Sequence, residues 1–100
     1  MTIQKINSSN FNEKIVKGKT LIKFSTSWCF PCRQLAPIIE DISKEIKDIN
    51  FYEIDADESS DIASQYEVMG IPTLILFNNG KEVKRIVGLR SKEDLKKELK

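Results

Sequence analysis

The chain has 100 residues, of which 40% are hydrophobic and 31% charged, and its formal net charge is +1. This length and balance predict one globular domain, residues 1–100, and the interspersed lysines and acids form no basic stripe that would bind nucleic acid. No apolar run is long enough to cross a bilayer, and residues 1–6 lack the apolar core of a signal peptide. We therefore expect a cytoplasmic monomer that does not associate with a membrane.

The N-terminal segment predicts a short strand followed by a helix. The strand falls within residues 1–6 and the helix at about 10–17. Asn10 and Glu13 have the spacing of a capping box, in which each side chain accepts a hydrogen bond at the helix start. Gly18 is suited to the C-terminal cap of this helix.

A buried strand and a long helix come next. Residues 20–25 are mostly apolar, although Lys23 places a charge in the middle of them. Apolar side chains then recur every three or four residues over 31–47, which predicts an amphipathic helix. Pro31 fits the first turn of that helix, and Pro37 inside it is expected to cause a kink.

The second half of the chain predicts three strands, two of them joined in a hairpin. The strands are expected at 51–54, 73–77 and 81–87, with a weaker helix around 62–66 after the first. Asn78-Asn79-Gly80 is a strong signal for a tight hairpin between the last two.

The last segment predicts a C-terminal helix and completes the order of elements. Ser91 and Asp94 resemble a second capping box, and Leu95 and Leu99 give the helix a narrow apolar edge. The order β-α-β-α-β-α-β-β-α predicts an α/β fold with a central mixed sheet, helices on both faces and a closing hairpin. The strand–helix–strand units require the early strands to be parallel.

Both cysteines of the chain lie between the second predicted strand and the long helix, in Trp28-Cys29-Phe30-Pro31-Cys32. Two thiols one helical turn apart lie on the same side of that turn and can reach each other. In a reducing cytosol such a pair rarely forms a permanent structural disulfide, so a redox role and a metal-binding role remain as the alternatives. A zinc site needs four ligands, and this chain has two cysteines and no histidine, so a metal site would need a dimer. We expect a dithiol/disulfide redox pair and no metal.

Several motifs around this pair carry a resemblance to a known family. They are Trp28-Cys29-Phe30-Pro31-Cys32, Ala36-Pro37, Gly70-Ile71-Pro72-Thr73, Phe77-Asn78-Asn79-Gly80 and Val87-Gly88. In order and spacing, over essentially the whole chain, the sequence resembles the thioredoxin family. The resemblance implies the thioredoxin fold and a protein-disulfide oxidoreductase that serves cell redox homeostasis. Its expected partners are disulfide-containing proteins and thioredoxin reductase, which would supply electrons from NADPH, with no cofactor bound to the chain itself.

The two cysteines are expected to have different roles in this reaction. Cys29 would lie at the positive N-terminal end of the 31–47 helix, where the helix dipole favours a thiolate nucleophile. Cys32 lies one turn deeper, and we expect it to be better shielded and to resolve the mixed disulfide.

The resemblance also implies a docking surface beside the cysteines. Ile71–Pro72 would be a cis peptide bond beside the disulfide, with Ile71 offering backbone hydrogen bonds to an extended substrate. Trp28 would be a half-exposed platform and Gly88 a point of close approach. Without the resemblance, Pro72 could simply be a proline at the start of a strand, Trp28 a core tryptophan and Gly88 a turn glycine. The expected apolar patch consists of Trp28, Phe30, Ile71, Pro72, Val87, Gly88 and Leu89.

Phe30 and Lys23 depart from the family pattern. Phe30 stands where the family usually has Gly, and it is either neutral or a contributor to docking and redox poise. Lys23 stands where the family usually has a buried Asp, and Phe51 replaces a common Lys. Lys23 could lie along apolar surface and extend its ammonium into water. Alternatively, it lies under Cys32, either as a cation that makes the Cys29–Cys32 couple more oxidising or as a neutral amine that accepts the Cys32 proton. Glu53 is the candidate partner of Lys23.

Two other functions therefore stay open beside that of a general reductant. The missing Asp favours a more oxidising disulfide oxidase or isomerase. A non-redox binding scaffold is the alternative from another functional class.

Overall fold

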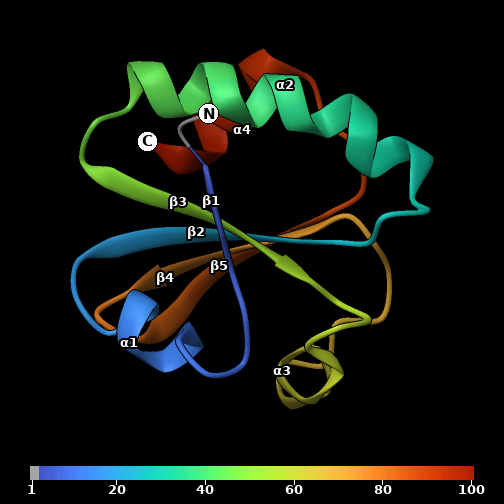
Figure 1. Ribbon diagram of the computed structural model, residues 1–100. Coiled ribbons are helices and arrows are strands. Elements are labelled where there is room, and N and C mark those ends of the chain that lie inside the picture. The colour runs from blue at the N-terminus through green and yellow to red at the C-terminus, as the bar shows by residue number, and fades with distance from the viewer. Residues whose placement is uncertain (1–2) are drawn as a thin grey trace.

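The computed structural model describes residues 3–100 and contains one five-stranded mixed sheet (Figure 1). The strands are β1 (Gln4–Ile6), β2 (Lys19–Ser25), β3 (Ile49–Asp55), β4 (Thr73–Asn78) and β5 (Lys81–Val87), in the spatial order β1-β3-β2-β4-β5. The helices are α1 (Phe11–Ile15), α2 (Phe30–Glu45), α3 (Ser60–Gln65) and α4 (Lys92–Leu99).

The directions of the strands confirm the predicted α/β topology. Both β1 and β2 run parallel to β3, as the strand–helix–strand units require. The last two strands are antiparallel, β4 to β2 and β5 to β4. The predicted element order is confirmed throughout, and bounds differ by a few residues at most.

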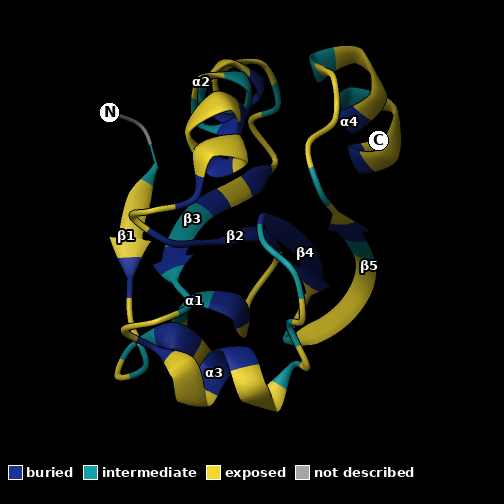
Figure 2. Ribbon diagram, turned by 90° about the vertical axis from the view of Figure 1, so that its right-hand side faces the viewer, coloured by how far each residue is buried: buried dark blue, intermediate teal, exposed yellow. Residues whose placement is uncertain are grey.

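Helices cover both faces of the sheet, α2 and α4 on one side and α1 and α3 on the other (Figure 1). Because side chains alternate along a strand, each face has its own core. One core is built of Leu21, Leu35, Ile39, Ile42, Ile49, Phe51, Leu74, Leu76, Ile86, Leu95 and Leu99. The other is built of Ile6, Phe11, Ile15, Ile22, Phe24, Ile54, Ile62, Ala63, Ile75 and Phe77. Figure 2 shows the buried residues concentrated in the central strands and the exposed ones along β5.

The start of α1 differs from the prediction. Asn10 precedes the helix, but its Oδ1 accepts the backbone N–H of Asn7 at 2.8 Å, and its side chain makes no capping bond to the helix. The predicted capping box is therefore wrong, because the amide is already used by the preceding turn. At α4 the Ser91 Oγ does accept the N–H of Asp94 at 3.1 Å, as predicted.

The hairpin between β4 and β5 turns at Asn79 and Gly80, as predicted. Both residues have positive φ, 52° and 88°, which is the conformation of a type I′ turn. The Asn79 Oδ1 also accepts the N–H of Gly18 at 2.8 Å, and the Asn79 N–H donates to the Gly18 carbonyl at 2.9 Å. The hairpin is thereby fixed to the loop that leads into β2.

Candidate active site

Cys29 and Cys32 form a disulfide at the start of α2, with their Cα atoms 5.3 Å apart. Cys29 is the N-cap residue of the helix, and its Sγ accepts the backbone N–H of Cys32 at 3.2 Å. Pro31 lies in the first turn, where a missing N–H costs no hydrogen bond. The expected position of Cys29 at the helix N-terminus is confirmed, and a thiolate there would meet backbone N–H donors and the positive end of the dipole.

The two sulfur-bearing residues do not differ in exposure as predicted. Cys29 is 4% and Cys32 3% exposed, so the expectation of a more open Cys29 is wrong for the disulfide form. Both residues belong to the buried start of α2, so residue exposure does not separate them. What distinguishes the two residues is their place on α2, Cys29 at its cap and Cys32 one turn further on.

Trp28 is a largely exposed side chain held in place by a polar contact. It is 68% exposed, and its Nε1–H donates to the Asp57 Oδ2 at 2.8 Å. The Nη2 of Arg33 donates to the Ser27 carbonyl at 2.9 Å and ties the same loop to α2. Asp57 was not among the predicted site residues. Its signal was available, because it follows β3, and the carboxyl ends of the parallel strands β2 and β3 meet at one edge of the sheet.

The loop before β4 contains the expected cis bond, between Ile71 and Pro72. The Pro72 ring is buried, and its carbonyl accepts the N–H of Gly88 at 2.8 Å. Gly88 has a φ of +93°, which only glycine adopts without strain. Residues 70–73 and 87–88 are thus joined by the backbone, while packing of Pro72 against the disulfide stays a prediction.

Exposed apolar side chains gather in the segments that the prediction assigned to docking. Trp28, Phe30, Val87 and Leu89 are exposed, whereas Ile71 and Gly88 are partly exposed. Pro72 is buried, so it contributes its backbone and shape more than open area. Sequence reasoning missed Met69, which is 95% exposed and precedes the Gly70-Ile71-Pro72 loop.

Lys23 lies in the middle of β2, the central strand, and is buried. Its direct neighbours in the sheet are Glu53 on β3 and Leu74 on β4. Its Nζ lies 3.8 Å from the Glu53 Oε2, and the two side chains are 5% and 32% exposed. The interpretation of Lys23 as a surface residue is therefore wrong, because the central strand is covered on this face by α2. The predicted pairing with Glu53 is confirmed.

A cavity of about 250 Å³ connects this ion pair with the redox centre. The Ser25 Oγ donates to the Glu53 Oε2 at 3.0 Å. The Thr26 Oγ1 is buried and has no hydrogen-bond partner within residues 3–100. The lining residues are Lys23, Ser25, Thr26, Ser27, Cys32, Arg33, Ala36 and Glu53.

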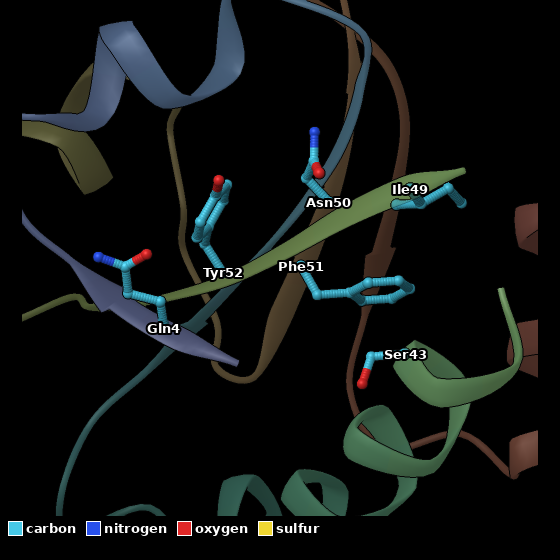
Figure 3. A pocket seen from close by; sticks show the side chains of 6 residues that line it. All are labelled: Gln4, Ser43, Ile49, Asn50, Phe51 and Tyr52. Carbon is cyan, nitrogen blue, oxygen red and sulfur yellow. The ribbon is translucent and has the colours of Figure 1, made fainter. Parts of the chain in front are cut away.

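Phe51 has no place in the redox centre. It is a buried core residue that lines a separate depression of about 300 Å³, together with Gln4, Ser43, Ile49, Asn50 and Tyr52. Figure 3 shows Phe51 pointing from β3 toward Ser43 of α2, while Asn50 and Tyr52 point to the opposite side of the strand. This depression contains no cysteine and offers no redox chemistry.

Comparison with known proteins agrees with the geometry. The thioredoxin family model matches residues 2–100. The chain belongs to the thioredoxin family. It is 48% identical to a thioredoxin of Chlamydia pneumoniae over 90 residues, which cover 90% of this chain and 88% of that one. It is 40% identical to a thioredoxin of Staphylococcus saprophyticus over 96 residues, 95% of this chain and 92% of the relative.

A solved thioredoxin has the same architecture. The oxidised mitochondrial thioredoxin 3 of Saccharomyces cerevisiae superposes with a TM-score of 0.88 at 33% identity, over 96% of this chain and 92% of that one. The fold is therefore the thioredoxin fold, a mixed five-stranded sheet with four helices.

These findings establish the reaction class of the chain. It is a thiol–disulfide oxidoreductase of the thioredoxin family that acts on disulfide-containing substrates, and the Cys29–Cys32 pair is its redox-active centre. Across residues 3–100, no helix combines the length and apolarity needed to span a membrane. Within the same residues, no group of three or more His, Cys, Asp or Glu side chains is arranged to hold a metal ion.

Proposed function

We propose that this thioredoxin is a general reductant of protein disulfides in the cytoplasm, acting as a monomer with no bound cofactor. The observation that carries the proposal is the position of Cys29 as the N-cap of α2, with its Sγ already accepting a backbone N–H. A helix N-terminus stabilises a thiolate, and the thiolate is the species that attacks a disulfide.

The proposed cycle has two exchange steps. The Cys29 thiolate attacks one sulfur of a target disulfide, which forms a mixed disulfide and releases the first target thiolate. The Cys32 sulfur then attacks the Cys29 sulfur, which releases the second target thiolate and closes the Cys29–Cys32 disulfide. The target has gained two electrons, and thioredoxin reductase returns two electrons from NADPH to the protein.

The apolar residues around the pair would hold the target during this cycle. Trp28 and Phe30 flank Cys29 with exposed rings, and Ile71 and Gly88, which are partly exposed, would present backbone groups to the target. The Pro72 carbonyl is already used by Gly88, so an extended target strand would pair with Ile71. Pro31 keeps the first turn of α2 in a helical geometry between the cysteines.

Two serine variants test these roles. With NADPH, thioredoxin reductase and insulin as the substrate, we expect C29S and C32S both to lose turnover. C32S should accumulate a covalent mixed disulfide with insulin that non-reducing electrophoresis detects, whereas C29S should not. Trapping by C29S in place of C32S would reverse the assignment, and turnover by C29S would contradict the mechanism.

A more oxidising function is the second candidate, and buried Lys23 is the observation that favours it. A cation near Cys32 stabilises the thiolate, hence the reduced protein. The reduction potential of the Cys29–Cys32 pair, measured against glutathione, distinguishes an oxidase from a general reductant. An oxidase would also form disulfides in a reduced, unfolded substrate at a rate that a reductant does not reach.

A further inference from the structure

The cavity beneath the redox centre contains a carboxylate that comes from β3. Lys23 and Glu53 are direct neighbours on β2 and β3, and Cys32 of α2 lines the same cavity. The Lys23 side chain is almost fully buried at 5% exposure, whereas that of Glu53 is 32% exposed. Glu53 is therefore the charged group of this pair that reaches both the cavity and solvent.

The contacts of Glu53 leave one of its oxygens available. Lys23 Nζ and Ser25 Oγ both approach Oε2, at 3.8 and 3.0 Å. Over residues 3–100, Oε1 accepts no hydrogen bond. One oxygen orients the carboxylate and the other can accept a proton, while Lys23 supplies the counter-charge.

The cavity can also connect the carboxylate with the thiol. Its volume is about 250 Å³, and one water molecule takes up about 30 Å³ of liquid. Ser25, Thr26 and Ser27 line it, and the buried Thr26 Oγ1 has no partner within the described chain. Polar walls of this kind suit a short chain of water molecules that carries a proton between groups that do not touch.

We infer that Glu53 accepts the proton of the Cys32 thiol when Cys32 resolves the mixed disulfide, and that Lys23 is the residue that positions Glu53. The Cys32 S–H bond breaks, and its proton passes through water to the carboxylate. The sulfur that keeps the electron pair attacks Cys29, the bond between Cys29 and the target sulfur breaks, and the target leaves as a thiolate. This inference rests on the resolving role proposed for Cys32.

The other charged groups at the cavity do not compete for this proton. Arg33 of α2 is a cation and already donates to the Ser27 carbonyl. Lys23 faces the Glu53 carboxylate, with its Nζ 3.8 Å from Oε2, and serves as the counter-charge that orients it. On β4 the neighbour of Lys23 is Leu74, which carries no charge. The charged and titratable groups of the cavity are thus Lys23, Cys32, Arg33 and Glu53.

A chromogenic disulfide isolates the resolving step. The reduced protein is mixed with dithiobis-nitrobenzoate, whose first thionitrobenzoate is released by Cys29 and whose second is released by Cys32. We expect E53Q to slow the second release about tenfold near neutral pH, toward the lower end of the effect of a general base. The rate of E53Q should rise more steeply with pH, because hydroxide then replaces the carboxylate. E53D should recover part of the rate.

Controls separate failure of this inference from failure of the proposed roles. E13Q removes an equivalent charge from α1, on the opposite face of the sheet, and should leave both releases unchanged. Loss of the second release in C32S shows that Cys32 resolves, and its persistence there would overturn that assignment. A normal second release and pH profile in E53Q, with C32S blocked, would overturn the role of Glu53 alone.

A measurement on the unaltered protein covers the case in which E53Q does not fold. The ionisation of the Glu53 carboxylate is followed by carbon-13 NMR of the reduced protein. The rate of the second release should fall as that carboxylate becomes protonated. A rate that shows no inflection across that titration would overturn the inference without any variant.

Discussion

Lys23 places a cation in the central strand, on the sheet face that carries Cys32. Because the reduced protein holds thiolate charge at this end of α2 and the disulfide holds none, a nearby cation favours the reduced form. The carboxylate of Glu53 acts in the opposite sense and partly offsets the lysine. The redox poise of the pair is therefore set by two charges on neighbouring strands.

We predict opposite shifts in potential for the two members of this pair. K23M should lower the reduction potential by about 10–30 mV, and E53Q should raise it, where 30 mV corresponds to about 1.4 kcal/mol for two electrons. Equilibration with glutathione measures both. K97M removes an exposed lysine of α4 and should leave the potential unchanged. Equal potentials in K23M and the unaltered protein would show that the cation does not tune the pair.

Phe30 adds an exposed ring beside Cys29. We predict that F30A lowers kcat/KM for insulin about fivefold, since partial burial of a phenylalanine ring in a complex is worth roughly 1 kcal/mol. The loss should lie in KM, and reduction of a small disulfide should not change. V83A, which trims another exposed apolar side chain on β5, is the matched control. An equal loss for both substrates would place the effect in the chemistry of the pair.

At the scale of elements, the hairpin turn depends on backbone conformation more than on contacts. Gly80 has a φ of +88°, and a Cβ there would lie 3.8 Å from the Val16 Cα, which is an ordinary contact. We predict that G80A lowers the free energy of unfolding by about 1–2 kcal/mol, the cost of a left-handed backbone for an L-residue. Urea unfolding measures it.

Gly70 provides the control for this substitution. Its φ is not in the left-handed region, and a Cβ there would lie 3.6 Å from the Val87 Cγ1. G70A should therefore change stability little. A loss in G70A as large as in G80A would show that space, and not φ, limits both positions.

The elements themselves were largely predictable from the sequence. Apolar spacing identified α2, and Asn78-Asn79-Gly80 identified the hairpin, because both are local properties of the chain. The cap of α1 was not predictable, since Asn10 can bond forward to the helix or backward to Asn7 with the same residue pattern. Which bond forms depends on the path of the preceding loop.

The active site was also predictable only in part. Residues 28–32 could be identified directly because they are contiguous. Glu53 was found as a candidate partner of Lys23 because it lies two residues after Phe51, on the same face of that strand. The sequence left open whether Lys23 is buried or exposed, because its burial depends on β2 being the central strand under α2. The contact of Trp28 with Asp57 was missed because it joins two loops that only the parallel pairing of β2 and β3 brings together.

At the scale of the whole molecule, a charge cluster links the two helices on one face of the sheet. Glu45 at the end of α2 contacts Lys92 at 2.5 Å and Lys96 at 2.6 Å, both on α4. Hydrogen bonds from Lys92 and then Lys96 lower the pKa of Glu45 from 4.5 to about 2. A carboxyl whose pKa is depressed by folding stabilises the protein above its unfolded pKa and loses that effect as the pH falls.

We predict that E45Q is less stable than the unaltered protein at pH 7 and that this difference shrinks between about pH 4.5 and pH 2. High salt should reduce the difference, because the cluster is exposed to solvent. Urea unfolding at several pH values measures it. Asp48→Asn, in the loop after α2, is the charge-matched control. A difference that stays constant down to pH 2 would exclude the Glu45 cluster as its source.

The hydrogen bond of Trp28 has an optical consequence. Trp28 is the only tryptophan of the chain, it directly precedes Cys29, and its indole N–H donates to Asp57. All tryptophan emission of the protein therefore originates at the active site, with no background from the core. The natural chain thus carries its own fluorophore at the point where targets arrive, and thiol exchange and docking can both be followed in real time without a label.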